Sequence, residues 1–412
     1  MTKKSDAPAI RFKGFSDAWE QRKLGELVDR VVRKNTNNES TLPLTISAQY
    51  GLVDQITYFN NRVASRDVSN YYLVLNGEFA YNKSTSDGYP FGAVKRLDLY
   101  EKGVLSTLYI VFAPKKEQQI DSDYLTVFFD TDRWHKGVAE RAAEGARNHG
   151  LLNISAEDFF DIDLSVPKDI VEQKQIGAFI RQLDNLITLH QRKFEKLTNV
   201  KKSMLEKMFP QNGSSYPEIR FKGFTDPWEQ RKVGDLLIER NQQAPMSDEY
   251  PLMAFIANEG VAPKGERYDR SALVTDTVNK LYKKTEKGDF IYSSNNLETG
   301  SIGLNKYGKA CISPVYSIFE PTGIADSDFL GRRLVRKDFI NAMVKWRQGV
   351  IYGQWRIHES DFLKIEITVP SVEEQRKIGA YLDQLDNLIT LHQRELEKLQ
   401  NIKKSMLEKM FV

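Results

Sequence analysis

The sequence of 412 residues lacks the features that disulfide-bonded, secreted and membrane proteins require. Its single cysteine, Cys311, cannot form an internal disulfide. No apolar run follows the first ten residues and none is long enough to span a membrane, so we expect a cytoplasmic protein that does not enter a membrane. Its 59 Lys and Arg residues nearly balance 56 Asp and Glu residues, so the formal charge of +3 neither requires nor excludes a polyanionic partner.

Recognisable catalytic machinery is also missing. The sequence has no Asn-Pro-Pro-aromatic motif and no GxGxxG fingerprint after a strand. The segment from Gly303 to Lys309 fits GxxxxGK, but Ala310 follows where a phosphate-binding loop needs a hydroxyl, so we expect a turn. His135, His149 and His358 lack ligand spacing for zinc. We therefore expect no catalytic residue, no metal and no cofactor in this chain.

What the sequence does contain is a long internal repeat. Ile10–Lys23 recurs as Ile219–Lys232 with two changes, and Gln173–Phe209 recurs as Gln375–Phe411. Within the second pair, QLDNLITLHQR is identical at 182–192 and 384–394. A repeat of about 200 residues is far longer than a solenoid unit of roughly 20–50 residues, which indicates duplication of a whole module. The repeated tryptophans Trp19 and Trp228 are expected to anchor each opening segment by core packing.

Each closing segment predicts one long helix, because no proline interrupts it and its glycine lies near its start. A helix of this length spans about 55 Å and needs a partner for its apolar stripe. Two equivalent modules related by a twofold axis would place the helices antiparallel, so we predict one antiparallel coiled coil. Its predicted seam consists of Ile176, Leu183, Ile187, His190, Phe194 and Leu197 with Ile378, Leu385, Ile389, His392, Leu396 and Leu399.

The seam contains one histidine near the middle of each helix. In an antiparallel pair, His190 and His392 would approach each other near the crossing of the helices. A polar position in an apolar seam commonly fixes the register, and we favour this interpretation. The alternative is a pH switch or a metal site, although two histidines alone seldom form a metal site.

The central portions predict mixed α/β domains, two in tandem with pseudo-twofold symmetry. Strands are expected over 105–112 and 312–319, and helices over 123–130 and 339–347. The expected domain organisation is a first domain with its N-terminal strip at 1–166, a first long helix at 167–209, a linker at 210–218, a second domain at 219–369 and a second long helix at 370–412.

Basic and polar side chains gather at corresponding places in the two halves. Such groups contact phosphates or base edges in DNA-binding proteins, whereas a solvated basic face is the simpler explanation of any single residue. The second half also carries Arg332, Arg333 and Arg336 nearby. The candidate DNA-binding residues are Lys83, Ser84, Arg133, His135, Lys136, Arg141, Arg147, Asn148 and His149 in the first half, and Ser293, Ser294, Asn295, Asn296, Arg347, Tyr352, Gln354, Trp355 and Arg356 in the second.

Over its whole length the chain resembles the specificity subunits of Type I restriction-modification systems. The resemblance rests on the doubled QLDNLITLHQR helices, the Glu-Gln pairs at 172–173 and 374–375 that follow Pro167 and Pro370, and the doubled GF-[ST]-D-x-W-E-Q-R-K openings. Asn153-Ile154-Ser155 before the exit strand adds a weaker signature, which the second half replaces by Arg356-Ile357-His358.

The resemblance implies a DNA reader without chemistry of its own. Each of two target-recognition domains would read one half of a split target in double-stranded DNA, and the helices would set the gap and dock two modification subunits. Those subunits would bring S-adenosylmethionine to methylate adenine, and restriction subunits would add ATP- and magnesium-dependent translocation and cleavage. A structural coiled-coil adaptor with two protein-binding domains is the alternative, and salt-dependent DNA affinity would separate the two.

Overall fold

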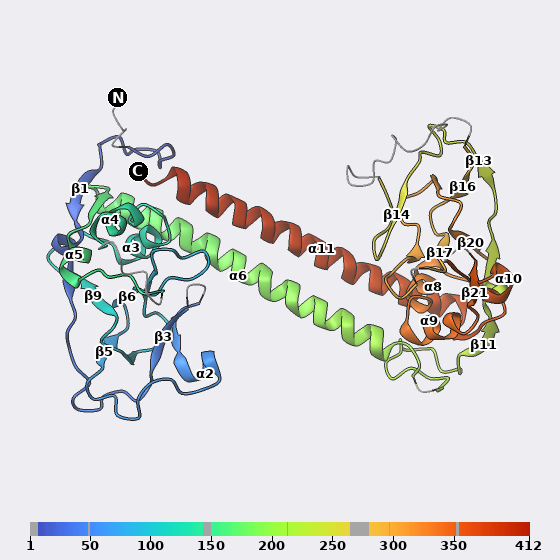
Figure 1. Cartoon of the computed structure of the whole chain (residues 1–412), viewed down its shortest axis with the longest axis horizontal. Helices are drawn as coiled ribbons and strands as arrows, with labels where there is room; N and C mark the ends of the chain where they lie inside the picture. Colours follow the sequence, from blue (N-terminus) through green and yellow to red (C-terminus); the bar gives the residue numbers. More distant parts are fainter. Residues whose placement is uncertain are drawn as a thin grey trace. The chain divides into compact units, whose positions relative to one another are not determined.

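The computed structural model describes residues 7–47, 50–142, 150–211, 213–263, 280–295, 297–351 and 354–412, with side chains at all of these except 348–351, 354 and 355. The chain divides into two compact units. Unit 1 comprises Met1–Gln191 with Arg394–Val412, and unit 2 comprises Arg192–Gln393. Each unit therefore contains one mixed α/β domain together with one half of each long helix (Figure 1).

The domain of unit 1 is built around a four-stranded antiparallel sheet in the order β2-β9-β6-β7. Two-stranded pairs β3-β4, β5-β8 and β1-β10 flank it. The strands are β1 Glu20–Lys23, β2 Val28–Arg30, β3 Leu44–Ser47, β4 Gly51–Asp54, β5 Tyr72–Leu75, β6 Phe79–Asn82, β7 Ala93–Arg96, β8 Lys102–Leu105, β9 Ile110–Pro114 and β10 Asp163–Val166, and the helices are α1 Leu24–Leu27, α2 Gln55–Phe59, α3 Ser122–Phe129, α4 His135–Arg141 and α5 Ala156–Phe160.

Unit 2 repeats this plan with the sheet β12-β20-β17-β18. It is accompanied by β13-β16-β19, β14-β15, β21-β22 and β11-β23. The strands are β11 Glu229–Lys232, β12 Leu237–Glu239, β13 Gln243–Ala244, β14 Ala254–Ile256, β15 Gly260–Ala262, β16 Tyr282–Thr285, β17 Phe290–Tyr292, β18 Ile302–Leu304, β19 Ala310–Ile312, β20 Ser317–Pro321, β21 Gln348–Ile351, β22 Gln354–Arg356 and β23 Glu366–Val369, and the helices are α7 Val233–Leu236, α8 Ser327–Arg333, α9 Lys337–Val344 and α10 Glu359–Phe362.

The predicted continuous strand at 105–112 is wrong. Strand β8 ends at Leu105 and β9 begins at Ile110, and between them the N–H of Tyr109 donates to the carbonyl of Ser106 at 3.2 Å. The prediction at 312–319 fails in the same way, because a turn joins β19 to β20. The two strands that meet at each turn belong to different sheets, so each turn carries the chain from one sheet to another.

The two long helices are α6 Ile170–Lys207 and α11 Val372–Lys409. In unit 1 the first half of α6 packs against the last part of α11, where Lys403 Nζ lies 2.7 Å from Asp184 Oδ1. In unit 2 the roles are exchanged, and Lys201 Nζ lies 2.5 Å from Asp386 Oδ1. The pairing is therefore antiparallel within each unit (Figure 1).

The proposed seam positions lie along one side of each helix. Near the first domain Ile176 and Leu183 are buried, while Ile187 and the later α6 seam positions are half-buried between exposed neighbours. The α11 positions follow the same order from Ile378 onward. The Asp184–Lys403 pair sets the register of the two antiparallel helices in unit 1. Six residues after Asp184 on α6 and six before Lys403 on α11, this register places His190 level with Glu397. The approach of His190 to His392 joins residues of different units and stays a prediction.

The start of each long helix is fixed to its domain by buried polar groups. The buried Gln173 accepts the N–H of Asp121, the N-cap of α3, at 2.8 Å and donates to the carbonyls of Gln119 and Pro167. Gly177 lets α3 approach closely, since a Cβ there would lie 2.9 Å from the backbone nitrogen of Tyr124. This anchoring fixes the first domain on its helix, and Gln375 repeats it in unit 2.

The end of each long helix is fixed to a domain by aromatic packing. Phe411, just after α11, is 3% exposed and contacts Trp19, Tyr124 and Phe128, with ring centroids 5.7–6.3 Å apart. In unit 2, Phe209 contacts Trp228 and Phe329 in the same manner. The repeated tryptophans are therefore core residues, as their sequence context predicted.

Candidate nucleic-acid interface

In unit 1 the candidate residues Lys83 and Ser84 begin the loop 83–92, which connects β6 to β7. The carbonyl of Lys83 accepts the N–H of Leu152 at 3.0 Å, and its ammonium donates to the carbonyl of Ile154 at 3.3 Å. Thr85 donates its N–H to the carbonyl of Gly150 at 2.7 Å. The structure thus places loop 83–92 beside residues 150–154, which directly follow three of the predicted DNA-binding residues in sequence.

The base of this loop is rigid while its tip is exposed. Gly92 has φ +76°, and a Cβ there would lie 2.1 Å from the carbonyl oxygen of Asn82, so only glycine fits. The hydroxyl of Tyr81 donates to the carbonyl of Phe91 at 2.9 Å, and burial raises the pKa of this phenol. Residues 86–90 are all exposed. A fixed base with an exposed tip suits a loop that reads a partner.

Unit 2 places its candidate residues in the corresponding arrangement. Ser293 and Ser294 follow β17, and Ser294 Oγ accepts the N–H of Ile357 at 3.1 Å. Arg347 donates to the carbonyl of Ser294 at 3.3 Å and forms a bidentate pair with Glu298 at 2.7 and 2.8 Å. The loop after the third strand of each sheet is therefore held against the chain that precedes α5 or α10. The candidate Asn295 is half-buried in this loop.

Several basic candidates of unit 1 have structural partners. Arg133 donates to the carbonyl of Glu408 in the last turn of α11 at 2.8 Å, which suits a helix C-terminus. Lys136 lies 3.5 Å from Glu140 on its own helix, and Arg141 forms three hydrogen bonds with Asp161 at 2.7, 2.8 and 3.2 Å. The contacts of Arg133 and Arg141 favour structural roles over contacts with DNA bases, whereas the pair of Lys136 lies on the surface.

His135 is the candidate of unit 1 that contacts the loop directly. Its ring lies 4.9 Å from that of Phe91 and 4.7 Å from that of Trp134, centroid to centroid. Burial between these rings lowers the pKa of the imidazole, although the nearby Asp132 carboxylate opposes this shift. A neutral His135 therefore packs as an aromatic ring beneath the end of loop 83–92.

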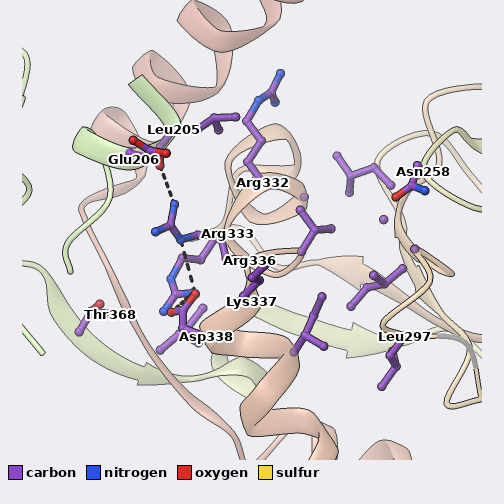
Figure 2. Close-up of a pocket in the computed structure, with 18 of the residues that line it drawn as sticks. Leu205, Glu206, Asn258, Leu297, Arg332, Arg333, Arg336, Lys337, Asp338 and Thr368 are labelled. Carbon is purple, nitrogen blue, oxygen red and sulfur yellow. Dashed lines mark hydrogen bonds and ion pairs between the residues drawn. The ribbon is translucent and has the colours of Figure 1, made fainter. Parts of the chain in front are cut away.

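The arginines at the end of α8 and just after it in unit 2 line a pocket of about 1580 Å³. In Figure 2 the guanidinium groups of Arg333 and Arg336 are directed toward Asp338 and toward the backbone at Leu205. Arg332, on the same surface, pairs with Asp383 and Asp386 of α11 at 2.6 and 3.0 Å. Arg332 and Arg336 therefore hold the long helices to the domain, while Arg333 pairs within it. Sequence could not reveal the contacts of Arg332 and Arg336 with the helices, because those partners lie far away along the chain.

Of the remaining candidates, only Arg356 has a described side chain. It ends β22 and is exposed. Gln354 and Trp355 belong to the same strand, and their side chains lie outside the described ones. Arg147, Asn148, His149, Asn296 and Tyr352 lie outside the described residues.

One feature of the surface was not predicted from the sequence. Helix α2 of unit 1 buries none of its five residues, although it contains Ile56, Tyr58 and Phe59. A signal was present, because the apolar residues are followed directly by Asn60, Asn61 and Arg62, a mixture of groups found at interaction surfaces.

In the part of the chain that the structure describes, no group of three or more His, Cys, Asp and Glu residues could hold a metal ion. The same residues include no helix long and apolar enough to cross a membrane.

Comparison with known proteins identifies the class of this fold. The family described as the Type I restriction modification DNA specificity domain matches residues 17–199 and again 225–401. The chain belongs to this family and carries two copies of its domain. It is a DNA-specificity subunit rather than an enzyme, which confirms the resemblance found in the sequence and decides against the adaptor alternative. Specificity subunits of this class work in complexes with DNA and with modification and restriction subunits.

Individual relatives cover nearly the whole chain. Two are named as the MjaX and MjaVIII type I restriction enzyme specificity subunits of Methanocaldococcus jannaschii. The first is 23% identical over 94% of this chain and 92% of its own length, and the second 24% over 85% and 82%. The crystal structure of a Type I S subunit from M. genitalium matches with a TM-score of 0.56 at 15% identity, covering 98% of this chain and 99% of that one. This match shows a shared fold.

Proposed function

We propose that unit 1 and unit 2 each read one half of a bipartite double-stranded DNA target, while α6 and α11 set the distance between the halves. The observation that carries this proposal is the repeated position of the two candidate loops. Both loops are anchored to equivalent segments, but their residues differ: Asn82-Lys83-Ser84 in unit 1 stand where unit 2 has Ser293-Ser294-Asn295. A repeated frame with different reading groups suits two different half-sites.

The helices are also proposed to dock two modification subunits. Their identical stretch includes outward-facing leucines, and seam packing does not explain why these are repeated. Leu186 and Leu189 are 43% and 45% exposed, and Leu388 and Leu391 are 43% and 51% exposed. Residues three apart share one face of a helix, so each pair forms a small apolar surface. The two equivalent surfaces support the docking of two copies of the same partner.

The chemistry is proposed to belong to those partners. The modification subunits would bind S-adenosylmethionine and methylate adenine in each half-site. Restriction subunits would use ATP and magnesium for translocation and cleavage. The present chain contributes recognition and spacing, for which basic and polar side chains on a rigid frame are suited.

Single-molecule sequencing of DNA methylation tests this proposal. Cells that carry this chain and its modification subunit are compared with cells that lack only this chain. A split motif with methyladenine in both halves, lost on deletion, is expected. An unchanged methylation map in the presence of active modification subunit would refute it. DNA affinity of the purified complex should also fall steeply with salt, because phosphate contacts release counterions.

A further inference from the structure

An exposed apolar surface follows strand β4 in unit 1. Residues 56–63 form an unbroken exposed run. Within it Ile56, Tyr58, Phe59 and Val63 are 38%, 48%, 50% and 66% exposed. Helices of globular proteins normally turn such residues toward a core, and contiguous exposed apolar groups mark interaction sites. Figure 1 shows α2 at an edge of unit 1.

Polar contacts hold this segment in a defined conformation. Asp54 caps α2 by accepting the N–H of Ile56 at 3.0 Å and the hydroxyl of Thr57 at 2.6 Å. The side-chain carbonyl of Gln55 accepts the N–H of Ala64 at 2.6 Å, which ties the start of α2 to the chain that follows it. The aromatic rings are therefore displayed by a preformed element, and the fold does not depend on burying them.

The rings themselves form an edge-to-face pair. The centroids of Tyr58 and Phe59 are 5.0 Å apart, with an interplanar angle of 81°. Two adjacent rings on the exposed side of a short helix form a narrow apolar projection. Such a projection matches the apolar wedges that proteins insert between base steps of DNA.

The charges around the rings match a polyanion. Residues 55–66 include Arg62 and Arg66 but no carboxylate, and Arg62 donates to the carbonyls of Ala64 and Ser65 at 3.3 and 3.0 Å, which fixes its guanidinium beside the rings. The flanking carboxylates cap local backbone, since Asp54 accepts the amide of Ile56 and Asp67 that of Ser69. Cationic groups beside an exposed aromatic pair suit contacts with phosphates on either side of a base step.

The position of α2 connects it to the candidate reading loop. Strand β4 leads directly into α2 and packs on β7, which begins where loop 83–92 ends. In unit 2 the corresponding hairpin β14-β15 touches the reading loop, because Asn258 at its turn donates its N–H to the carbonyl of Gly300 at 3.0 Å. The hairpin that carries α2 is thus a neighbour of the proposed interface.

We infer that Tyr58 and Phe59 form an aromatic wedge that packs against a base step in the DNA half-site read by unit 1 and partly unstacks it, with Arg62 and Arg66 on the flanking phosphates. This inference rests on the proposed function and adds to it a means of recognition through DNA deformability. Unstacking costs least at flexible pyrimidine–purine steps, so the wedge would select such a step without reading a base edge.

The test uses the complex of the full chain with its modification subunit and DNA duplexes containing the half-sites found by methylation sequencing. 2-Aminopurine, whose fluorescence increases on unstacking, is placed at each step of the unit 1 half-site in turn. With the wild-type chain, fluorescence should rise at one step. Phe59→Ala and Tyr58→Ala should abolish the rise and weaken binding about 5- to 150-fold, the range for losing one stacked base. Arg62→Ala and Arg66→Ala should each reduce the salt slope by about one.

Leu108→Ala serves as the matched control, because Leu108 is 66% exposed in unit 1 and lies on the turn between β8 and β9. It should retain both the fluorescence rise and the affinity. Specific binding by the wild type without a rise at any step would overturn the wedge. Variants that bind DNA normally but lose the modification subunit would overturn it in favour of a protein-docking surface. If the wild-type complex does not prefer the half-sites to a scrambled duplex, the proposed function fails first, and the wedge with it.

Discussion

Arg11 and Glu172 form a buried bidentate ion pair that joins the N-terminal strip to the first turn of α6. Nε and Nη2 of Arg11 donate to the two carboxylate oxygens at 2.6 and 2.8 Å, and the side chain of Glu172 is only 1% exposed. This carboxylate raises the pKa of the guanidinium, chiefly through the hydrogen bond. Arg220 and Glu374 repeat the pair in unit 2 at 2.7 Å. In each half, the repeated opening motif therefore attaches the opening segment to the long helix that closes that half.

Removing Arg11 should loosen the start of α6. Arg11→Met leaves a buried carboxylate unpaired, which typically costs about 3–5 kcal/mol. Hydrogen exchange of the amides in the first turns of α6 reports the local opening free energy and should show a loss of that order. The double variant Arg11→Met/Glu172→Leu should recover much of it, because no unpaired charge remains.

A surface ion pair provides the control for this experiment. Lys136 and Glu140 lie 3.5 Å apart with side chains 81% and 57% exposed. Lys136→Met should change local stability by less than about 0.5 kcal/mol. Wild-type protection of α6 in Arg11→Met would show that the buried pair does not hold the helix.

Two glycines of loop 83–92 should respond differently to substitution. Both have φ +76°, but a Cβ at Gly88 meets nothing within 4 Å, whereas one at Gly92 collides with the carbonyl of Asn82. Gly88→Ala should therefore cost only the left-handed backbone penalty of about 1–2 kcal/mol. Gly92→Ala should in addition displace the loop and weaken binding of the unit 1 half-site by about tenfold or more, which corresponds to at least 1.4 kcal/mol. Equal affinities for the two variants would argue against a reading role for this loop.

The pKa of His135 predicts a dependence of stability on pH. Burial lowers this pKa in the folded state, so the unfolded chain, with a histidine pKa of about 6.5, binds the proton more readily. Stability from this group is fully present above pH 6.5 and is lost as the pH falls from there toward the folded-state pKa. His135→Phe keeps the ring packing and removes the titration.

The measurement is urea unfolding of wild type and His135→Phe at several pH values. The difference between their unfolding free energies should be constant above about pH 6.5 and should shift in favour of the variant below it. A difference that stays constant down to pH 5 would show that His135 is not buried as a neutral ring.

Periodicity in the sequence was enough to predict the long helices, because apolar residues such as Ile and Leu that recur every three or four positions indicate a helix whatever it packs against. The turn at Ser106 was missed for a physical reason. Thr107 and Tyr109 have strong β propensity, yet Ser106 Oγ accepts the N–H of Leu108 at 3.4 Å and the chain reverses. In unit 2 a usable signal was overlooked, since Pro314 follows Ser313 at the favoured second position of a turn.

The candidate interface was predictable only in outline. The loops at 83 and 293 were found because each follows the same Gly-acid-Phe-x-Tyr pattern. Their attachment to residues 150–154 and 357 depends on backbone hydrogen bonds between distant segments, which leave no trace in composition. For the same reason, sequence could not distinguish arginines that reach solvent from those, such as Arg336, that cap the end of α6 at Leu205.

The proposed spacing role of the long helices predicts the effect of a designed insertion. Seven residues added at equivalent points of α6 and α11 keep the heptad phase and lengthen both helices by about 10 Å. Because B-DNA rises 3.4 Å per base pair, the tolerated gap between the half-sites should grow by about three base pairs. Methylation sequencing of cells that carry the variant gives the new gap directly. The same insertion in α6 alone shifts pairs such as Lys403 with Asp184 out of register and should abolish methylation instead. An unchanged gap in the double insertion would mean that another element sets the spacing.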